Sequence, residues 1–198
     1  IYAQAVSQTG LSQKNGAGTS QIRITKSQDL SLRMSRIPDG EADLLLACDA
    51  VVGVADNSLK TLSKNKSQAI INVDVDPVGV VGFGNGTTVP EKVIFSRLEK
   101  FLDSKKFSTY NIQQICESLM GNKVTANVMM LGIALQKGMI PISVASVEKA
   151  LTLNGASVQD NLIALKWGRW LAYDKQYVLE VSGYNKVSSI NIGLENAG

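Results

Sequence analysis

The chain contains no histidine and only two cysteines, Cys48 and Cys116, among its 198 residues. The absence of histidine excludes Ser-His-Asp and Cys-His catalysis and most zinc sites. The cysteines form no Cys-x-x-Cys pair, and an iron–sulfur cubane normally requires four thiolates, so this chain cannot hold one unaided. We expect both cysteines to be small buried side chains rather than a disulfide. The sequence therefore predicts that this chain carries no redox centre.

Charge and hydrophobicity exclude further classes of protein. The net charge of +3 is too small to indicate binding to nucleic acid or to an anionic membrane. No apolar run approaches the roughly 20 residues that cross a bilayer, and no signal peptide is visible. A hydrophobic content of 44% is enough for one full core in a chain of this length. We therefore expect a soluble, cytoplasmic domain.

The first half of the chain predicts strands that alternate with helices. Strands are expected over residues 2–7, 19–26, 43–48 and 69–73, and the third is a continuous apolar run typical of a buried parallel strand. Asp49 can cap a helix over 50–63. Another helix is expected over 90–103, with Val93, Leu98 and Leu102 inward. The strand–helix–strand order implies a parallel pair, and 107–110 suits a last edge strand.

The second half of the chain predicts helices. A short one over 112–120 precedes a helix whose apolar stripe consists of Val124, Val128, Leu131 and Leu135. Gly138 can end that helix. The next helix is expected to begin after Ser143 as N-cap, to turn Val144, Val147 and Leu151 inward, and to end at Asn154-Gly155. A further helix is expected to carry Val158, Leu162 and Leu165 on its apolar side. The tail alternates at Tyr177, Leu179 and Val181, which indicates a strand or an extension toward a neighbouring domain.

Together these elements predict an α/β fold: a three-layer sandwich with a mostly parallel sheet and a C-terminal helical cluster. We expect a single domain over 1–198. It would comprise a sheet region at 1–110, a helical region at 111–176 and a tail at 177–198.

The loop between the first two strands is the best candidate binding site. Its glycines let backbone N–H groups turn toward an anion, and its polar side chains add donors. The alternative is a tight connection whose polar residues face water. The predicted site residues are Thr9, Gly10, Ser12, Gln13, Lys14 and Gly16. A second glycine cluster at 79–86 has no basic residue and is expected to be a flexible loop.

Other polar and aromatic residues have two interpretations each. Asn127, close to the apolar stripe, is expected to be a buried hydrogen-bonding group. Trp167, Arg169 and Trp170 either form a cation–π cluster against a partner domain or pack on a helix surface. No pair of carboxylates stands out for acid–base chemistry.

Three groups of residues, in chain order, resemble one known family. They are Thr9–Ala17 followed by Ser20–Ile24; Gly40–Asp49; and Asn127, Met130-Leu131-Gly132, Gln136-Lys137-Gly138, Pro141, Leu153-Asn154-Gly155, Asn161 and Trp167-Gly168-Arg169. The pattern resembles the gamma-type domain of 2-oxoacid:ferredoxin oxidoreductases, and is most similar to the indolepyruvate ferredoxin oxidoreductase branch. Two departures are Gln21, where the family usually has histidine, and Asn15, where it has glycine. The family's first βα unit is missing before Ile1, so we expect a fragment of a longer polypeptide.

This resemblance implies a function. The parent enzyme would use thiamine diphosphate and iron–sulfur clusters in other domains to convert indolepyruvate, or a related 2-oxoacid, to acyl-coenzyme A, CO2 and reduced ferredoxin. The gamma-type domain would contribute docking and coenzyme A handling, which assigns the loop at Thr9–Gly16 to the cofactor. Expected partners are other domains or subunits and, for the parent enzyme, ferredoxin. The chain alone would be inactive. The alternative is a structural interaction domain without a ligand site.

Overall fold

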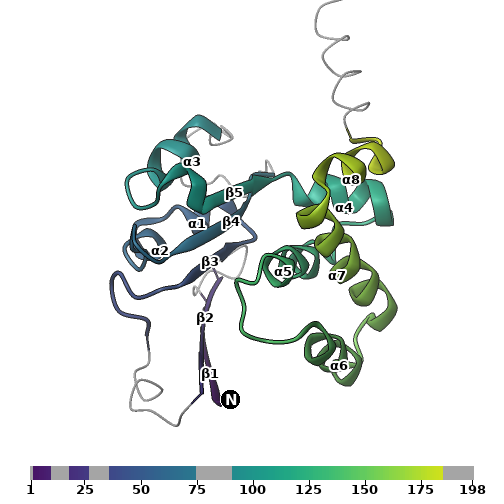
Figure 1. Ribbon diagram of the computed structural model, residues 1–198, viewed down its shortest axis with the longest axis horizontal. Coiled ribbons are helices and arrows are strands. Elements are labelled where there is room, and N and C mark those ends of the chain that lie inside the picture. The colour runs from purple at the N-terminus through teal and green to yellow at the C-terminus, as the bar shows by residue number, and fades with distance from the viewer. Residues whose placement is uncertain (1, 10–17, 27–35, 75–90, 185–198) are drawn as a thin grey trace, which may run out of the picture. The chain divides into compact units, whose positions relative to one another are not determined.

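The computed structural model describes residues 2–9, 18–26, 36–74 and 91–184, which belong to two compact units (Figure 1). Unit 1 comprises residues 1–71 and 75–108, and unit 2 comprises residues 72–74 and 109–198. Unit 1 contains a strand hairpin and most of a sheet, whereas unit 2 is helical. The α/β class, with parallel strand pairing and a C-terminal helical cluster, is confirmed.

The two predicted strands are present as β1 (Tyr2–Thr9) and β2 (Gly18–Thr25), and they pair as an antiparallel hairpin, which was not predicted from the sequence. The register pairs Tyr2 with Thr25 at one end and Thr9 with Gly18 at the other. The half-buried face of the hairpin includes Gln21, while Ile22 is exposed on the opposite face. Alternation of polar and apolar residues therefore locates these strands correctly but does not show which face is covered.

The main sheet has the order β3-β4-β5, with β3 (Leu44–Ala47), β4 (Gln68–Asn72) and β5 (Phe107–Tyr110). Strands β3 and β4 are parallel, and β5 lies at an edge, as predicted. The central strand β4 buries Ala69, Ile70 and Ile71 completely. The prediction that β3 is fully buried was wrong, because β3 lies at the other edge of this described sheet and its leucines are only half-buried.

The predicted helix over 50–63 is two short helices, α1 (Ala50–Gly53) and α2 (Asp56–Leu59). Glycine and a run of valines have low helix propensity, and the extended backbone of Ala55 separates the two turns. Gly53 lies so close to Ala47 that a Cβ there would overlap its side chain. Asp49 caps α1 as predicted, since its Oδ1 accepts a hydrogen bond from Val51 N at 2.8 Å.

Helix α3 (Glu91–Leu98) is shorter than the predicted helix over 90–103. It buries Ile94 and Leu98, whereas Val93 is exposed, so the predicted inward position of Val93 was wrong. A 3-10 turn, η3 (Ser104–Lys106), leads into β5. There Phe107 packs edge-on against Phe95, with ring centroids 5.4 Å apart.

Unit 2 contains α4 (Ile112–Met120), α5 (Ala126–Gln136), α6 (Val144–Asn154), α7 (Val158–Tyr173) and α8 (Lys175–Ser182). The first four were predicted, and the left-handed glycines at 138 and 155 end α5 and α6 as expected. Ser143 caps α6 by accepting a hydrogen bond from Ser146 N at 3.2 Å.

The prediction of a strand from residue 177 was wrong, because α8 occupies this part of the chain. Asp174 caps the helix by accepting a hydrogen bond from Tyr177 N at 3.0 Å, and Gly183 ends it with a φ of 69°. Val178 is completely buried, while Tyr177 and Val181 are exposed. The apolar residues thus follow a helical rather than a two-residue period.

The predicted apolar stripe of α5 was right for Leu135, which is buried, but Val128 and Leu131 are only half-buried and the position of Val124 was wrong. Val124 precedes the helix and is 81% exposed, while Met129, Met130 and Ile133 are buried. Asn127, predicted to be buried, is exposed, and its Oδ1 accepts a hydrogen bond from Val128 N. Helix α5 is apolar on nearly all sides, so the spacing of its hydrophobic residues did not determine which side faces the core.

Two glycines bring α5 and α7 into backbone contact. A Cβ on Gly132 would lie 3.1 Å from the Cα of Gly168. A Cβ on Gly168 would overlap the carbonyl oxygen of Met129. Only hydrogen fits at this crossing, which sets the separation of the two helices on which the rest of unit 2 packs.

Replacing Gly168 with alanine should destabilise the chain by about 1–3 kcal/mol, because an inserted methyl group would collide with a backbone carbonyl that cannot rotate away. This steric cost exceeds the gain of about 1 kcal/mol in helix propensity. Urea denaturation measures the change. The control is Gly18→Ala, where a Cβ meets nothing within 4 Å, and its effect should stay below about 0.5 kcal/mol. Equal effects of the two substitutions would contradict the tight crossing.

Candidate functional site

The predicted anion-binding loop joins the two strands of the hairpin. Thr9, paired with Gly18, forms the base of this loop. The other predicted site residues lie outside the described residues: Gly10, Ser12, Gln13, Lys14 and Gly16. Binding at this loop therefore stays a prediction. The glycine cluster at 79–86 also lies outside the described residues.

The hairpin is tied to the chain that precedes β3. The Oε1 atom of Gln21 accepts a hydrogen bond from Ile37 N at 2.5 Å. The guanidinium group of Arg23 donates to the carbonyl oxygen of Arg36. Gln21 is one of the two positions at which the sequence departs from the family that it resembles. In the structure its side-chain amide oxygen accepts a hydrogen bond from a backbone N–H. Its observed role is thus to position the hairpin.

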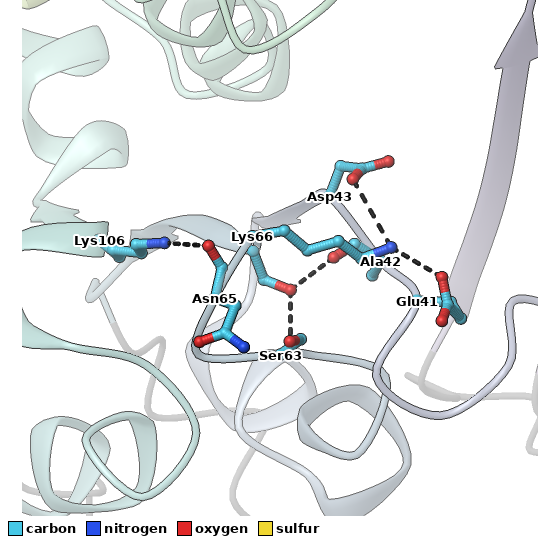
Figure 2. Close-up of polar contacts among 8 residues, drawn as sticks. Glu41, Ala42, Asp43, Ser63, Asn65, Lys66 and Lys106 are labelled. Carbon is cyan, nitrogen blue, oxygen red and sulfur yellow. Dashed lines mark hydrogen bonds and ion pairs between the residues drawn. The ribbon is translucent and has the colours of Figure 1, made fainter.

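The motif Gly40–Asp49 contains β3, and its first residues are hydrogen-bonded to the turn before β4 (Figure 2). Lys66 Nζ lies 2.7 Å from Glu41 Oε2 and 3.9 Å from Asp43 Oδ1. The fully buried Ser67 donates from its hydroxyl to the carbonyl oxygen of Ala42 and accepts a hydrogen bond from Ser63 N at 2.7 Å. Every one of these polar groups thus joins two parts of unit 1.

The charges of this motif do not suit acid–base catalysis. A hydrogen bond from Lys66, together with its positive charge, lowers the pKa of Glu41 below its ordinary value. The hydrogen bond to Glu41 raises the pKa of Lys66 above its ordinary value. Both shifts move the pKa values of these side chains further from neutral pH. A general acid or base works best when its pKa lies near the working pH. The motif therefore has a structural role.

The carboxyl end of β4 meets the N-terminus of α4, a common place for ligands in α/β proteins. Here, however, the chain supplies its own carboxylate. Asp74 Oδ2 accepts hydrogen bonds from Gln113 N at 2.6 Å and from Gln114 N at 3.3 Å. Asn72 Oδ1 accepts one from Ile112 N at 3.1 Å. The first amides of α4 are therefore satisfied internally and are not available to an anionic ligand.

The two cysteines differ in their surroundings. Cys116 is buried as predicted, with its Sγ 3.5 Å from Thr125 Oγ1, but Cys48 is exposed, so the prediction for Cys48 was wrong. Cys48 directly follows edge strand β3, where the sheet ends. Desolvation raises the pKa of both thiols, and the negative charge of Asp49 raises that of Cys48 further. Within the described ranges, no three His, Cys, Asp or Glu side chains converge to hold a metal ion.

A concave patch is formed by residues of α5, α7 and α8. We call this patch the aromatic–basic surface. It surrounds a depression of about 380 Å³. Its residues combine rings and cations: Gln136, Lys166, Arg169, Trp170 and Tyr173 line the depression, and Tyr177 packs beside Trp170. Arg169 and Trp170 were identified from the sequence, but Tyr173 and Tyr177 were missed. Tyr177 was placed in a tail predicted to be a strand or an extension, and Tyr173 was not singled out.

Of the two interpretations for Trp167, Arg169 and Trp170, packing on a helix surface describes the observed contacts better than a cation–π cluster. Arg169 Nε donates to Gln136 Oε1 at 3.0 Å. Trp170 instead contacts the ring of Tyr173 at a centroid distance of 5.8 Å and that of Tyr177 at 5.6 Å. Trp167 is half-buried and does not line the depression. The tyrosines thus hold the exposed tryptophan, while the arginine is oriented by Gln136.

Comparison with known proteins identifies the family. Residues 1–170 match the description "Pyruvate ferredoxin/flavodoxin oxidoreductase". The chain belongs to this family. The crystal structure of pyruvate oxidoreductase subunit PORC from Thermotoga maritima is similar in fold, with a TM-score of 0.53 and 17% sequence identity, covering 85% of this chain and 78% of that one. No curated protein matches the chain in sequence. Among the helices described for this family member, none is long and apolar enough to cross a membrane.

Replacing Asp74 with alanine should destabilise the chain by about 0.5–2 kcal/mol, because two amides of α4 lose their acceptor. Asp74→Asn retains an oxygen acceptor and should recover most of this loss. Urea denaturation monitored by circular dichroism measures both variants. The interpretation fails if Asp74→Ala is as stable as the original chain.

Replacing Lys66 with methionine should bring the pKa of Glu41 back toward its ordinary value. Because folding lowers this pKa, the carboxylate stabilises the fold above its unfolded-state pKa, and that stabilisation disappears as pH falls through the folded-state pKa. NMR titration of the Glu41 carboxyl carbon reports the shift, and denaturation at neutral and acidic pH reports the stability. Lys64→Met, on a nearby exposed residue, should leave the Glu41 titration unchanged.

Proposed function

We propose that this chain is the gamma-type component of a 2-oxoacid:ferredoxin oxidoreductase that acts on indolepyruvate or a related 2-oxoacid. The family match over residues 1–170 is the observation that carries the proposal. The similarity of the fold to a subunit of pyruvate oxidoreductase is consistent with it. The preference for indolepyruvate rests on the three motifs that resemble that branch.

In the complete enzyme, thiamine diphosphate and iron–sulfur clusters held by other components supply the decarboxylation and electron-transfer chemistry, and coenzyme A collects the acyl group. The present chain binds and positions rather than reacts. This division of work agrees with its two protonated thiols and with carboxylates that serve as caps and ion pairs. Ferredoxin is the electron acceptor of the assembly in this proposal.

The hairpin loop is the proposed contact with coenzyme A. Its base is held by the paired strands and by the hydrogen bond between Gln21 and Ile37. A loop anchored in this way can direct backbone N–H groups at a diphosphate, and Lys14 adds a positive charge. The residues proposed to take part are Thr9, Gly10, Ser12, Gln13, Lys14 and Gly16.

The second candidate is a structural interaction domain that holds the catalytic components together and binds no ligand. The filled N-terminus of α4 favours it, since that helix end would otherwise attract a phosphate. The internal use of the polar groups in the motif Gly40–Asp49 also favours it. The two candidates differ in what the hairpin loop does.

Enzyme assays test the family function directly. The chain would be co-expressed with the proteins encoded beside it, and the purified assembly would be given indolepyruvate, coenzyme A and oxidised ferredoxin. We expect ferredoxin reduction that depends on all three components and on the presence of this chain. Reduction with pyruvate but not indolepyruvate would overturn the substrate assignment. An assembly that reduces ferredoxin equally well without this chain would overturn its proposed role.

Lys14→Ala should weaken coenzyme A binding about 5- to 10-fold, the typical loss for one charge-assisted contact to phosphate. Isothermal titration calorimetry of the assembly measures the dissociation constant. Lys64→Ala, a charge-matched change on an exposed turn, should bind as the original does. If millimolar coenzyme A produces no heat with the unmodified assembly, the structural interaction domain is the better description.

A further inference from the structure

Three aromatic side chains of the aromatic–basic surface are largely exposed to solvent. Trp170 is 49% exposed, Tyr173 76% and Tyr177 45%. A fully exposed side chain of this kind buries roughly 150–250 Å² when it is covered, and about half to three quarters of each of these three is still exposed. The three rings form one continuous cluster, and large exposed clusters of this kind are typical of interaction sites.

The charged side chains that line the depression are basic. Lys166 and Arg169 line the depression, and none of its lining residues is acidic. Two exposed acids lie near the rings along the chain but do not line the depression: Asp174, which accepts a hydrogen bond from Tyr177 N, and Glu180, which accepts one from Gln176 Nε2. Opposite charges across an interface guide association and exclude wrong partners. Charge complementarity at the depression therefore favours a ligand with negative charge.

The surface is also held rigidly. Gly168, next to Arg169, fixes α7 against α5, and Leu165 and Leu171 are buried on the same helix. Gln136 on α5 orients the Arg169 guanidinium group. Pre-organised side chains lose little entropy on binding, and tryptophan, tyrosine and arginine are the residues that most often dominate binding energy at protein interfaces.

The shape of the depression favours a protein over a small molecule. Small-ligand sites bury most of the surface of their ligand. Here two of the lining side chains, Trp170 and Tyr173, are themselves half or mostly exposed, so a small molecule would remain largely in water. A second depression, along α3 and Glu99, has lining residues of both charge signs and offers no comparable preference: Glu91, Lys92, Phe95, Ser96 and Glu99.

We infer that the aromatic–basic surface docks an acidic segment of another subunit of the same oxidoreductase. That segment carries carboxylates for Lys166 and Arg169 and an aromatic or apolar side chain that covers Trp170. The inference rests on the proposed function, which supplies the companion subunits. It adds the location of the docking surface and the chemistry of the partner.

Binding of the chain to its co-encoded subunits tests the inference. Trp170→Ala and Lys166→Glu should each raise the dissociation constant at least 10-fold, the first by removing apolar contact and the second by opposing the acidic partner. The controls lie on α6 of the same unit: Leu153→Ala, a residue 77% exposed, and Lys149→Glu, an exposed lysine. Both controls should stay within 2-fold of the original. Circular dichroism checks that every variant is folded.

Two further measurements separate the outcomes. Added salt should weaken the original complex more steeply than the Lys166→Glu complex, because screening acts on the charge pairs. The chain has two tryptophans, so fluorotryptophan labelling gives two fluorine resonances, and Trp170→Phe assigns them. The Trp170 resonance should shift with the companion subunits. A shift with adenosine monophosphate alone would show a small-molecule site and overturn the inference.

Variants that bind as tightly as the original would overturn this docking surface and leave the proposed function intact. If the original chain does not bind the companion subunits, the inference fails as well. The proposed function is then judged separately, by whether the co-expressed assembly needs this chain for 2-oxoacid-dependent reduction of ferredoxin.

Discussion

The contact between the backbones of α5 and α7 is the constraint on which unit 2 depends. Hydrogen atoms at Gly132 and Gly168 allow the helices to approach closely, and this approach buries Met129 and Leu165. Its position along α7 also matters for the surface. Arg169 and Trp170 follow Gly168 directly, so the residue that fixes the helix is adjacent to the residues that face outward. Core packing and the presentation of the aromatic–basic surface therefore have the same origin.

Several polar side chains of the described residues form hydrogen bonds or ion pairs that stabilise the fold. Asp74 caps α4, Lys66 joins Glu41 to the turn before β4, and Ser67 satisfies two buried backbone groups. A side chain already engaged in such bonds would have to break them before it could bind a ligand. The aromatic rings of α7 and α8 are different, because they contact one another and still expose much of their area. The polar groups are thus used within the fold, whereas the rings of this surface remain exposed.

The sequence predicted most elements because their signals are local. Gly138, Ser143 and Gly155 act on the backbone within a few residues, and Asp49 caps its own helix. The errors occurred where neighbours in space decide the outcome. Ile22 lies on the exposed face of the hairpin, Val124 precedes α5 and is exposed, and Cys48 follows an edge strand and is exposed. The strand interpretation of the tail from residue 177 was wrong for a related reason. A short apolar pattern fits both the two-residue period of a strand and the 3.6-residue period of a helix, and in the structure Asp174 caps a helix there.

The sequence by itself determined the α/β class, the parallel pairing of β3 with β4, the order of helices in unit 2 and the resemblance to the family. These follow from hydrophobic period, capping residues and motifs, which are properties of neighbouring residues in the chain. Only the tertiary structure decided that Gly132 meets Gly168, that Asp74 fills the N-terminus of α4, and that Tyr173 and Tyr177 gather around Trp170. Each of these depends on which faces of the elements meet. The side chains of a nearly uniform apolar helix do not encode that choice, because burial stabilises any of its faces to a similar extent.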